Sequence, residues 1–397
     1  MNNNAVNELY VHWMGSGFDD HTAWANAVFE YTIRHDTSAL NDMAIQPSSQ
    51  DAIEVVILGF ERLAEGLLLY QEWMLPLWGV LSEALIRASA RGVSIECLSI
   101  GHVELPMNVL HVLAPALKVA PVKLLHLKNN RLHRVGIRFL TQTIKTNQVI
   151  ERIALKETQL DVVSVVSLVE SFQHHNQLKS LSLDKCSIGR SSSLMSVLVH
   201  SLPSSNIRHL CLAHNHIGSL ESEIIATYLA SDPPIESIDL DGNSLCDADV
   251  ALISNALKSN RTLRGLRLSG NSLGNGGKLA LCCLIYNVSS LDAIHCSNHT
   301  CIVTSDFDLP DCNRYFSRKA NRVSKLLGVL FTDFAFIFLA DVPLTIVPFV
   351  LDFVQYPDFN MPLTRIFHLV RDWNMLTTNL RKSENINAGK RKRAVTW

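Results

Sequence analysis

A single hydrophobic pattern, LxxLxLxxNxL, recurs through the middle of the chain and limits what it can fold into. Eight copies follow one another at spacings of 27 to 29 residues. They begin at Ile95, Val122, Ile150, Leu178, Ile207, Ile235, Leu263 and Leu291. A fixed period of this length is typical of repeat proteins, in which each unit buries its apolar edge only against its neighbours. The pattern predicts a stacked array from Ile95 to Cys301, with one short strand and one amphipathic helix in each unit.

The sixth unit shows how the pattern works. Strand alternation places Ile238 and Leu240 on one face and Ser237, Asp239 and Asp241 on the other. We therefore expect Leu240→Ala to cost about 2 to 5 kcal/mol as a core truncation, and Asp241→Ala to be nearly silent. Further along, the apolar spacing becomes helical, and Asp247 or Asp249 is placed to cap the start of that helix.

Position nine of the pattern is where the chain leaves the strand. An asparagine there can bond the unpaired backbone groups of the turn, so we interpret these residues as structural. They are Asn130, Asn215, Asn243 and Asn271. Thr158, Cys186 and His299 take this position in other units, and Val103 takes it in the first, so those turns must be satisfied differently.

The 28-residue period, the Asn or Cys at position nine and the segment DADVALISNALKSNRTLRGLRLSGNSL resemble the ribonuclease-inhibitor class of leucine-rich repeats. The resemblance covers residues 95–301. It implies an α/β fold: a right-handed solenoid, or horseshoe, with a parallel concave sheet and outer helices. Members of this class include inhibitors of secreted nucleases, activators of small GTPases and sensor domains of immune receptors. The resemblance therefore implies a binding surface and leaves the partner open.

The flanking segments complete the predicted domain organisation. Residues 1–50 show no sustained pattern and are expected to be partly ordered. Residues 51–94 predict an irregular amino-terminal capping repeat, with a strand at 53–60 and a helical stretch over 62–91 that Pro76 interrupts. Residues 302–320 predict a connecting loop, 321–380 a helical carboxy-terminal cap, and 381–397 a basic, disordered tail.

Outward strand positions are expected to line the concave face and to bind a partner. The candidate residues are His126, Lys128, Arg152, Lys156, Asp184, His209, Asp239, Asp241 and Arg267. Their charge runs from basic to acidic along the array, which favours a partner with the opposite gradient. The positions include no Trp, Tyr or Phe, so we expect modest affinity. The alternative is that these charges only solvate the sheet.

Composition narrows the function classes. A formal net charge of −2 gives no general reason to expect nucleic-acid binding. Nine cysteines without short, even spacing argue against a disulfide framework and for a reducing compartment. The amino terminus lacks the basic and apolar regions of a secretory signal. We therefore expect an intracellular protein, cytoplasmic or nuclear.

Two segments resemble metal sites, but neither is complete. The segment that begins at Asp239 has the start of a calcium loop, but Ser244 and Val250 stand where the loop needs Gly and Glu. The set of His295, Cys296, His299 and Cys301 suggests zinc, but on a strand these side chains would diverge. The pair His174 and His175 has no nucleophile or second partner at a readable spacing and is expected to face solvent. We predict no cofactor, no metal and no catalytic residue.

The leading hypothesis is a non-catalytic scaffold that binds a protein on its concave face. The first alternative is a regulator of a small GTPase of the GTPase-activating type. The second is a membrane-peripheral, receptor-like protein held by the apolar residues 326–354, where Asp333, Asp341 and Asp352 argue against a membrane span. The tail sequence KRKR at 390–393 is either a nuclear import signal or a solvated tail.

Overall fold

The computed structural model describes residues 3–45, 53–58, 67–173, 175–310, 312–313 and 317–330. The strands are β1 Ile53–Leu58, β2 Ile95–Gly101, β3 Val122–Lys128, β4 Arg152–Lys156, β5 Ser180–Asp184, β6 His209–Cys211, β7 Ser237–Asp239, β8 Gly265–Arg267 and β9 Ile302–Thr304. The α-helices are α1 Asn3–Gly15, α2 Asp20–Ile45, α3 Met74–Ala90, α4 Met107–Val119, α5 Arg134–Thr146, α6 Val162–Phe172, α7 Ser192–Ser201, α8 Ser219–Ala230, α9 Asp247–Leu257, α10 Asn275–Ile285, α11 Leu291–Cys296 and α12 Arg318–Leu330. Two short 3₁₀ helices, η1 Ile188–Arg190 and η2 Leu202–Ser204, flank α7.

The strands form one sheet in which each strand lies beside the next one in the sequence. The sheet order runs from β1 to β9, and the pairs from β1·β2 to β7·β8 are parallel. In the seven units that begin between Ile95 and Leu263, each strand starts at the first residue of the pattern or two residues later. The α/β solenoid predicted from the repeat is therefore confirmed.

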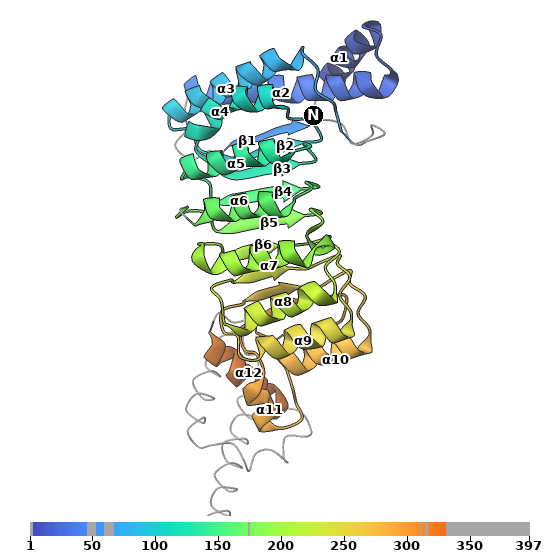
Figure 1. Cartoon of the computed structure of the whole chain (residues 1–397), viewed down its shortest axis with the longest axis vertical. Helices are drawn as coiled ribbons and strands as arrows, with labels where there is room; N and C mark the ends of the chain where they lie inside the picture. The colour runs from blue at the N-terminus through green and yellow to red at the C-terminus, as the bar shows by residue number, and fades with distance from the viewer. Residues whose placement is uncertain are drawn as a thin grey trace, which may run out of the picture. The chain divides into compact units, whose positions relative to one another are not determined.

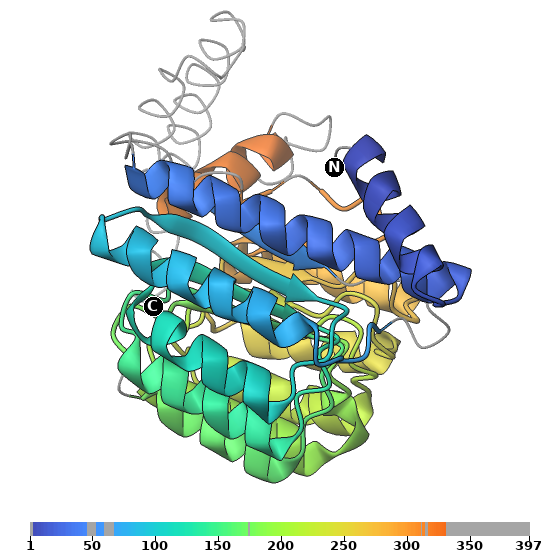
Figure 2. The same ribbon diagram turned by 90° about the horizontal axis from the view of Figure 1, so that it is seen from above.

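Chain contacts divide the protein into two compact units. The first holds residues 1–280 and 303–308, and the second holds residues 281–302 and the described residues from 309 onward. Within the first unit, helices α4 to α9 lie beside one another over one face of the sheet (Figures 1 and 2). The strand side chains on that face are buried at every level, from Leu98 and Ile100 in β2 to Leu266 and Leu268 in the unit of β8. This shared interior is the core that the repeat implied.

Leu240 tests the strand phase directly. Its side chain is 0% exposed, whereas Leu252, on α9 of the same unit, is 40% exposed. We expect Leu240→Ala to lower the free energy of unfolding by about 3 kcal/mol, because it removes core methyl groups and leaves a cavity. The matched change Leu252→Ala should cost less than about 1 kcal/mol, since this side chain is already partly in water. Urea unfolding measures both, and equal losses would show that the inward face has been misassigned.

The amino-terminal residues are more regular than the sequence suggested. Where only partial order was expected, α1 and α2 pack on each other around Trp13, Val6, Ala23 and Ala27. Asp36 on α2 accepts a hydrogen bond from the backbone N–H of Val56 in the edge strand β1, with Oδ2 2.6 Å from the nitrogen. Because an edge strand otherwise presents unpaired donors, α2 protects this end of the sheet.

The capping repeat differs from its prediction in one respect. Residues 53–58 form the expected strand, but the described helix over this region begins only at Met74. Pro76 lies in the first turn of α3, where the missing N–H would have had no intrahelical partner, and so it does not interrupt the helix.

The eighth copy of the pattern is wrong as a strand assignment. Residues Leu291–Cys296 form the helix α11, and the last strand is β9, at Ile302–Thr304. The Ser290 side chain accepts the N–H of Ala293 and caps α11, which is a local helix signal that competes with the repeat. The predicted connecting loop over 302–320 therefore includes β9 and the start of α12.

No helix in the described part of the chain is long and apolar enough to cross a membrane. The predicted membrane segment, residues 326–354, enters the described residues only as far as 330. Most of the predicted cap over 321–380 and all of the basic tail over 381–397 lie outside them.

Candidate functional site

The face of the sheet that helices α4 to α9 leave uncovered is here called the open face, and it consists of the side chains at pattern positions three, five and seven. Strand register stacks equivalent positions, so that Arg152 lies beside Ser180, and Lys156 lies beside Asp184. Further along, Cys211 lies beside Asp239, which lies beside Arg267. Neighbouring strands are about 4.8 Å apart, so these side chains form closely spaced rows.

At the β4–β5 end, the charges of the open face pair with one another. The Lys156 ammonium lies 2.7 Å from the Asp184 carboxylate on the adjacent strand. This hydrogen bond raises the pKa of Lys156. Arg152 reaches Glu96, two strands away, at 2.6 Å, and Glu96 also pairs with Lys123 at 2.9 Å. The basic stretch predicted from the sequence is therefore largely matched by acidic partners within the protein.

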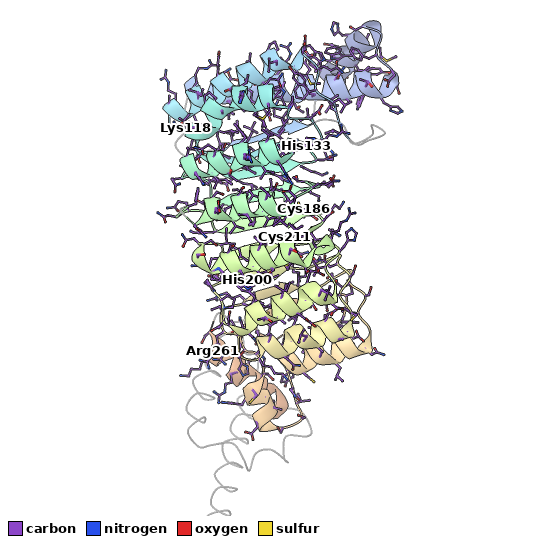
Figure 3. The ribbon with its side chains drawn as sticks, in the orientation of Figure 1. Lys118, His133, Cys186, His200, Cys211 and Arg261 are labelled. Carbon is purple, nitrogen blue, oxygen red and sulfur yellow. The ribbon has the colours of Figure 1, made fainter. Side chains whose placement is uncertain are left out.

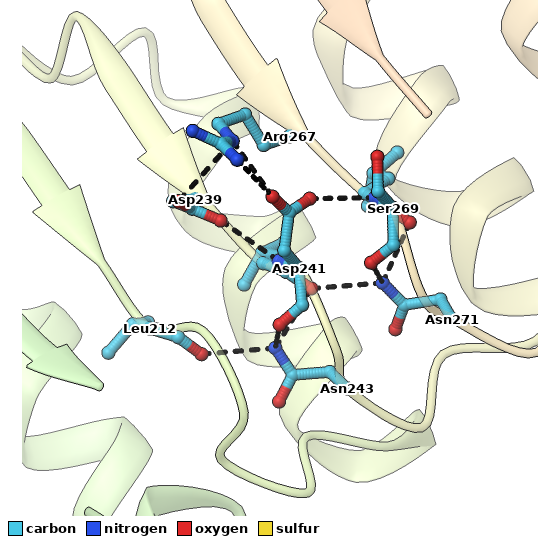
Figure 4. Close-up of polar contacts among 9 residues, drawn as sticks. Leu212, Asp239, Asp241, Asn243, Arg267, Ser269 and Asn271 are labelled. Carbon is cyan, nitrogen blue, oxygen red and sulfur yellow. Dashed lines mark hydrogen bonds and ion pairs between the residues drawn. The ribbon is translucent and has the colours of Figure 1, made fainter. Parts of the chain in front are cut away.

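At the β7–β8 end, one arginine joins two aspartates (Figure 4). The Arg267 guanidinium lies 2.6 Å from Asp241 and 3.4 Å from Asp239. The second carboxylate oxygen of Asp241 accepts the backbone N–H of Ser269 at 2.7 Å. Asp241 is thus tied to the next unit, and we now expect its truncation to cost about 1 to 2 kcal/mol instead of being nearly silent.

The histidines and Lys128 occupy the remaining predicted positions. His126 is half-buried, and its Nδ1 lies 3.2 Å from the Ser99 hydroxyl. Burial, followed by the charges of Lys156 and Lys128, lowers the pKa of His126, so its ring is neutral at neutral pH. His209 is exposed at the start of β6. The predicted residues therefore form two charged clusters with a gap between them, and their role in binding stays a prediction.

Small side chains fill the gap between the clusters. Ser180, Ser182, Cys211 and Ala213 lie there, and the exposed His209 is the one large residue among them. Cys211 is labelled in Figure 3. Burial raises the pKa of the Cys211 thiol, which therefore stays protonated near neutral pH. A protonated thiol is a poor nucleophile. This arrangement can contact another molecule closely, and it has no activated group at its centre.

The turn asparagines hold successive units together. Asn243 Oδ1 accepts the backbone N–H groups of Asn215 and Ile217 in the preceding unit, at 2.9 and 3.0 Å. Its amide nitrogen donates to the carbonyls of Leu212 and Leu240, at 3.0 and 2.9 Å. Asn215 repeats the arrangement one unit earlier, with Cys186 as one of its donors. We call Asn215, Asn243 and Asn271 the asparagine ladder.

Asn271 and Asn130 make fewer hydrogen bonds than Asn215 and Asn243. Asn271 accepts the N–H of Leu245 and donates to Leu240 and Leu268. Asn130 donates to the Val103 carbonyl at 2.8 Å, while its Oδ1 is buried and has no hydrogen-bond partner among the described residues.

Besides the units with Val103 and His299, two further units have no asparagine at this position. In one of them the Cys186 thiol lies 3.4 Å from the Leu155 carbonyl, and burial raises its pKa to about 12. The thiol thus takes the donor role of the amide. In the other unit, the Thr158 hydroxyl makes only a long contact of 3.4 Å, to the Lys156 carbonyl.

Position eight carries a feature that the sequence did not reveal. All seven units from Ile95 to Leu263 have a positive φ there. The residues are His102, Asn129, Glu157, Lys185, His214, Gly242 and Gly270. The left-handed backbone turns the chain away from the sheet while the N–H still pairs with the next unit, as in His214 to Asp241 O at 2.8 Å. A Cβ on Gly242 would lie 2.1 Å from the His214 ring, so a larger residue would fit there only if the exposed His214 side chain moved.

Position two carries a second unpredicted feature, a row of charges at the start of each strand. From the first unit to the seventh these residues are Glu96, Lys123, Glu151, Lys179, Arg208, Glu236 and Arg264. Their signs mostly alternate, and Arg264 lies 3.9 Å from Glu236. A comparison of the second residue of each repeat in the sequence would have found this row of charges.

Asp247 and Asp249, the two acidic candidates for helix capping, bond at the starts of two different helices. Asp249 accepts the N–H of Cys246 at 2.9 Å and so completes the start of α9. Asp247 instead accepts the N–H groups of Gly274 and Gly276, at 2.7 and 3.1 Å, where α10 of the next unit begins.

The structure separates the residues that suggested zinc. Cys296 is exposed on α11, whereas Cys301 is 0% exposed. His299 is buried, with its Nε2 3.2 Å from the His295 carbonyl. Among the described residues, no group of three or more His, Cys, Asp or Glu side chains is placed to hold a metal ion.

His175 is the clearest correction among the histidines. It was expected to face solvent, but it is 0% exposed. Its Nδ1 accepts the N–H of Leu178 at 3.0 Å, and its Nε2 donates to the Asn147 carbonyl at 2.9 Å. These bonds tie the turn after α6 to the preceding unit, which gives the residue a structural role. His174 lies outside the described residues.

Comparison with known proteins leaves the identity of the chain open. No protein-family model matches it, and no curated protein matches it. Among solved structures, one similar chain is "Leiomodin-1 Actin-Binding Site 2 (ABS2)", with 15% sequence identity and a TM-score of 0.26. The match covers 50% of this chain and 88% of that one. A similarity this low supports no conclusion about what this chain binds.

Proposed function

We propose that this protein is a non-catalytic scaffold that binds a protein partner on its open face, in the manner of the ribonuclease-inhibitor class that its sequence resembles. The observation that supports this proposal is the fixed geometry of that face. Its charged side chains are held by cross-strand pairs, and the strands are joined through the asparagine ladder. A surface whose side chains are already immobilised loses less conformational entropy when a partner binds.

The charge pattern points to a partner with two patches of mixed charge. The Lys156–Asp184 pair and the Arg267–Asp239–Asp241 cluster each present both signs, and small side chains separate them. Because the pairs are only partly exposed, they define orientation and specificity more than affinity. The centre offers close approach and carries no aromatic anchor, which fits a modest, readily reversible interaction.

A charge swap tests whether a partner binds to the open face. We expect each single change, Lys156→Asp or Asp184→Lys, to weaken partner binding at least tenfold, and we expect it to destabilise the fold because like charges then face each other. The double variant restores an internal ion pair with its polarity reversed. It should therefore recover the melting temperature and still fail to bind. Affinity capture, followed by a dissociation constant for the captured protein, measures the effect.

The control is the same swap on the helical side of the sheet. Glu83 and Arg87 pair at 3.3 Å on the exposed surface of α3. Exchanging them should leave binding unchanged. The exchange also removes the two hydrogen bonds from Arg87 to Asn41 Oδ1 on α2, so a small fall in the melting temperature is expected. A partner that binds the Lys156/Asp184 double variant as tightly as it binds the native chain would exclude the open face as the interface.

A further inference from the structure

A cavity of about 450 Å³ lies on the helical side of the repeats, between α7 and α8. It is lined by Val199, His200, Pro203, Glu223, Ile224, Thr227, Tyr228 and Ser231. All of these residues come from α7, η2, α8 or the residue after α8, so the cavity is separate from the open face. His200 is labelled in Figure 3. Pockets of roughly 300 to 1,000 Å³ that combine apolar walls with a few polar groups are typical of small-molecule sites.

Tyr228 is the most buried of the polar residues that line this cavity. Its side chain is only 8% exposed, and its hydroxyl makes no hydrogen bond within the described part of the chain. Burial raises the pKa of Tyr228 to about 12, so the hydroxyl keeps its proton. Buried tyrosine hydroxyls usually find a partner. The Tyr228 hydroxyl itself is not fully buried, so it faces the cavity, where a ligand atom can bond to it in place of water.

Two acceptors lie among the same lining residues. His200 Nδ1 is 2.7 Å from the Ser196 carbonyl, which can only accept, so Nδ1 carries the proton and Nε2 is an acceptor in the neutral ring. Glu223 is exposed and forms no ion pair with any described residue. Arg208, the nearby cation, is not a lining residue, and its guanidinium donates to the Ile207 carbonyl at 3.2 Å. The lining residues thus contribute one negative charge and no positive one.

From these groups we propose that the cavity binds an amine carried on an apolar body. Val199, Pro203 and Ile224 would enclose the apolar part, and the ammonium group would donate to Glu223 and His200 Nε2. The Tyr228 hydroxyl would complete its hydrogen bonding with the same ligand. Such an amine can be a free small molecule or the lysine side chain of another protein, and both present the same chemistry.

Titration of the full chain with matched probes tests this proposal. 2-Phenylethylamine, 2-phenylethanol and 3-phenylpropanoate share an aromatic body and differ in the charge of the head group. We expect the amine to bind at least tenfold tighter than the carboxylate, with NMR shift changes on α7 and α8. Acetyl-Ala-Lys-Ala-amide is titrated in parallel. Tighter binding of the peptide would identify a protein side chain as the natural source, and tighter binding of the free amine a small molecule.

Three variants connect the binding to named atoms. Tyr228→Phe removes only the unpartnered hydroxyl, so it should weaken amine binding about tenfold without lowering the melting temperature. Glu223→Gln should remove the preference for the amine over the alcohol, whereas Glu170→Gln, on the exposed surface of α6, should not. Ile224→Trp should fill the cavity and abolish binding, with the melting temperature showing that the fold is kept.

Several results would overturn the proposal. They are equal binding of the carboxylate and the amine, an unchanged affinity in Tyr228→Phe, and shift changes confined to residues outside α7, η2 and α8. The absence of amine binding at millimolar concentration, in a chain whose melting temperature is normal, would do the same.

Discussion

Replacing Asn243 by alanine is expected to lower the free energy of unfolding by about 5 kcal/mol, because three buried backbone groups lose their partner at once. These groups are the N–H of Asn215, the N–H of Ile217 and the carbonyl of Leu212. Each unsatisfied group costs about 1 to 3 kcal/mol when it stays buried. The Leu240 carbonyl keeps its bond to the Asn271 amide and does not add to the loss. Urea unfolding of the native chain and the variant measures the difference.

Asn271→Ala provides the graded control. This side chain is less buried than Asn243 and accepts from one backbone donor, the N–H of Leu245. Its removal should cost roughly half as much, since fewer groups are left without a partner. If the two variants were equally stable, the asparagine ladder would contribute nothing beyond the general loss of an amide. The stacking of units would then depend on the leucines alone.

The leucine positions could be read from the sequence because their physical cause is local. Strand alternation and apolar spacing act within a single unit, so Leu240 and Ile238 could be assigned to the interior before any neighbour was placed. The same reasoning failed at Leu291. The apolar spacing there fits the repeat, but Ser290 caps a helix, and the strand that completes the described sheet is β9. At this position the helix cap prevails, and the sheet continues through β9.

The electrostatics of the open face could not be read in this way. The sequence identified Lys156, Asp184, Asp241 and Arg267 as outward residues, and they were interpreted as a gradient that a partner could read. The structure shows that each charge lies within reach of an opposite charge in a neighbouring unit. Such pairing depends on strand register across about 28 residues of intervening chain, which periodicity alone does not specify.

The left-handed backbone at position eight was hidden for a related reason. Glycine signals such a turn openly, as at Gly242, but Glu157 and Lys185 adopt the same conformation without any sequence marker. These two side chains also pair with each other, at 3.5 Å. Bonding between units therefore offsets a strain that a single residue would not otherwise tolerate. The structure thus shows one principle throughout the array: each unit satisfies backbone and charge requirements of the unit beside it.

Acid is expected to destabilise the second compact unit, which holds residues 281–302 and the described residues from 309 onward. Two buried bases there lie close together and lack a counter-ion among the described residues. His299 is 1% exposed, and burial followed by the charge of Lys325 lowers its pKa from 6.5 to about 3. Lys325 is 3% exposed, donates to the Asn298 carbonyl at 2.6 Å, and has a pKa lowered by burial to about 8. In both cases the native chain binds protons less readily than the unfolded chain.

The two groups act in different pH ranges. For Lys325, stability increases as the pH rises from about 8 to 10.5, where the unfolded chain alone holds the proton. For His299, stability is fully present above pH 6.5 and is lost as the pH falls towards 3. Between pH 6.5 and 4 the histidine accounts for about 3 kcal/mol, at 1.36 kcal/mol for each pH unit.

Native-state hydrogen exchange at the Thr300 and Cys301 amides, which bond to Asn298 Oδ1, should report this loss locally. His299→Gln should flatten the response in this range, whereas the same change at the exposed His111 should leave it intact. Equal protection of those two amides at pH 7 and pH 4 in the native chain would mean that His299 gains its proton without opening the structure around it.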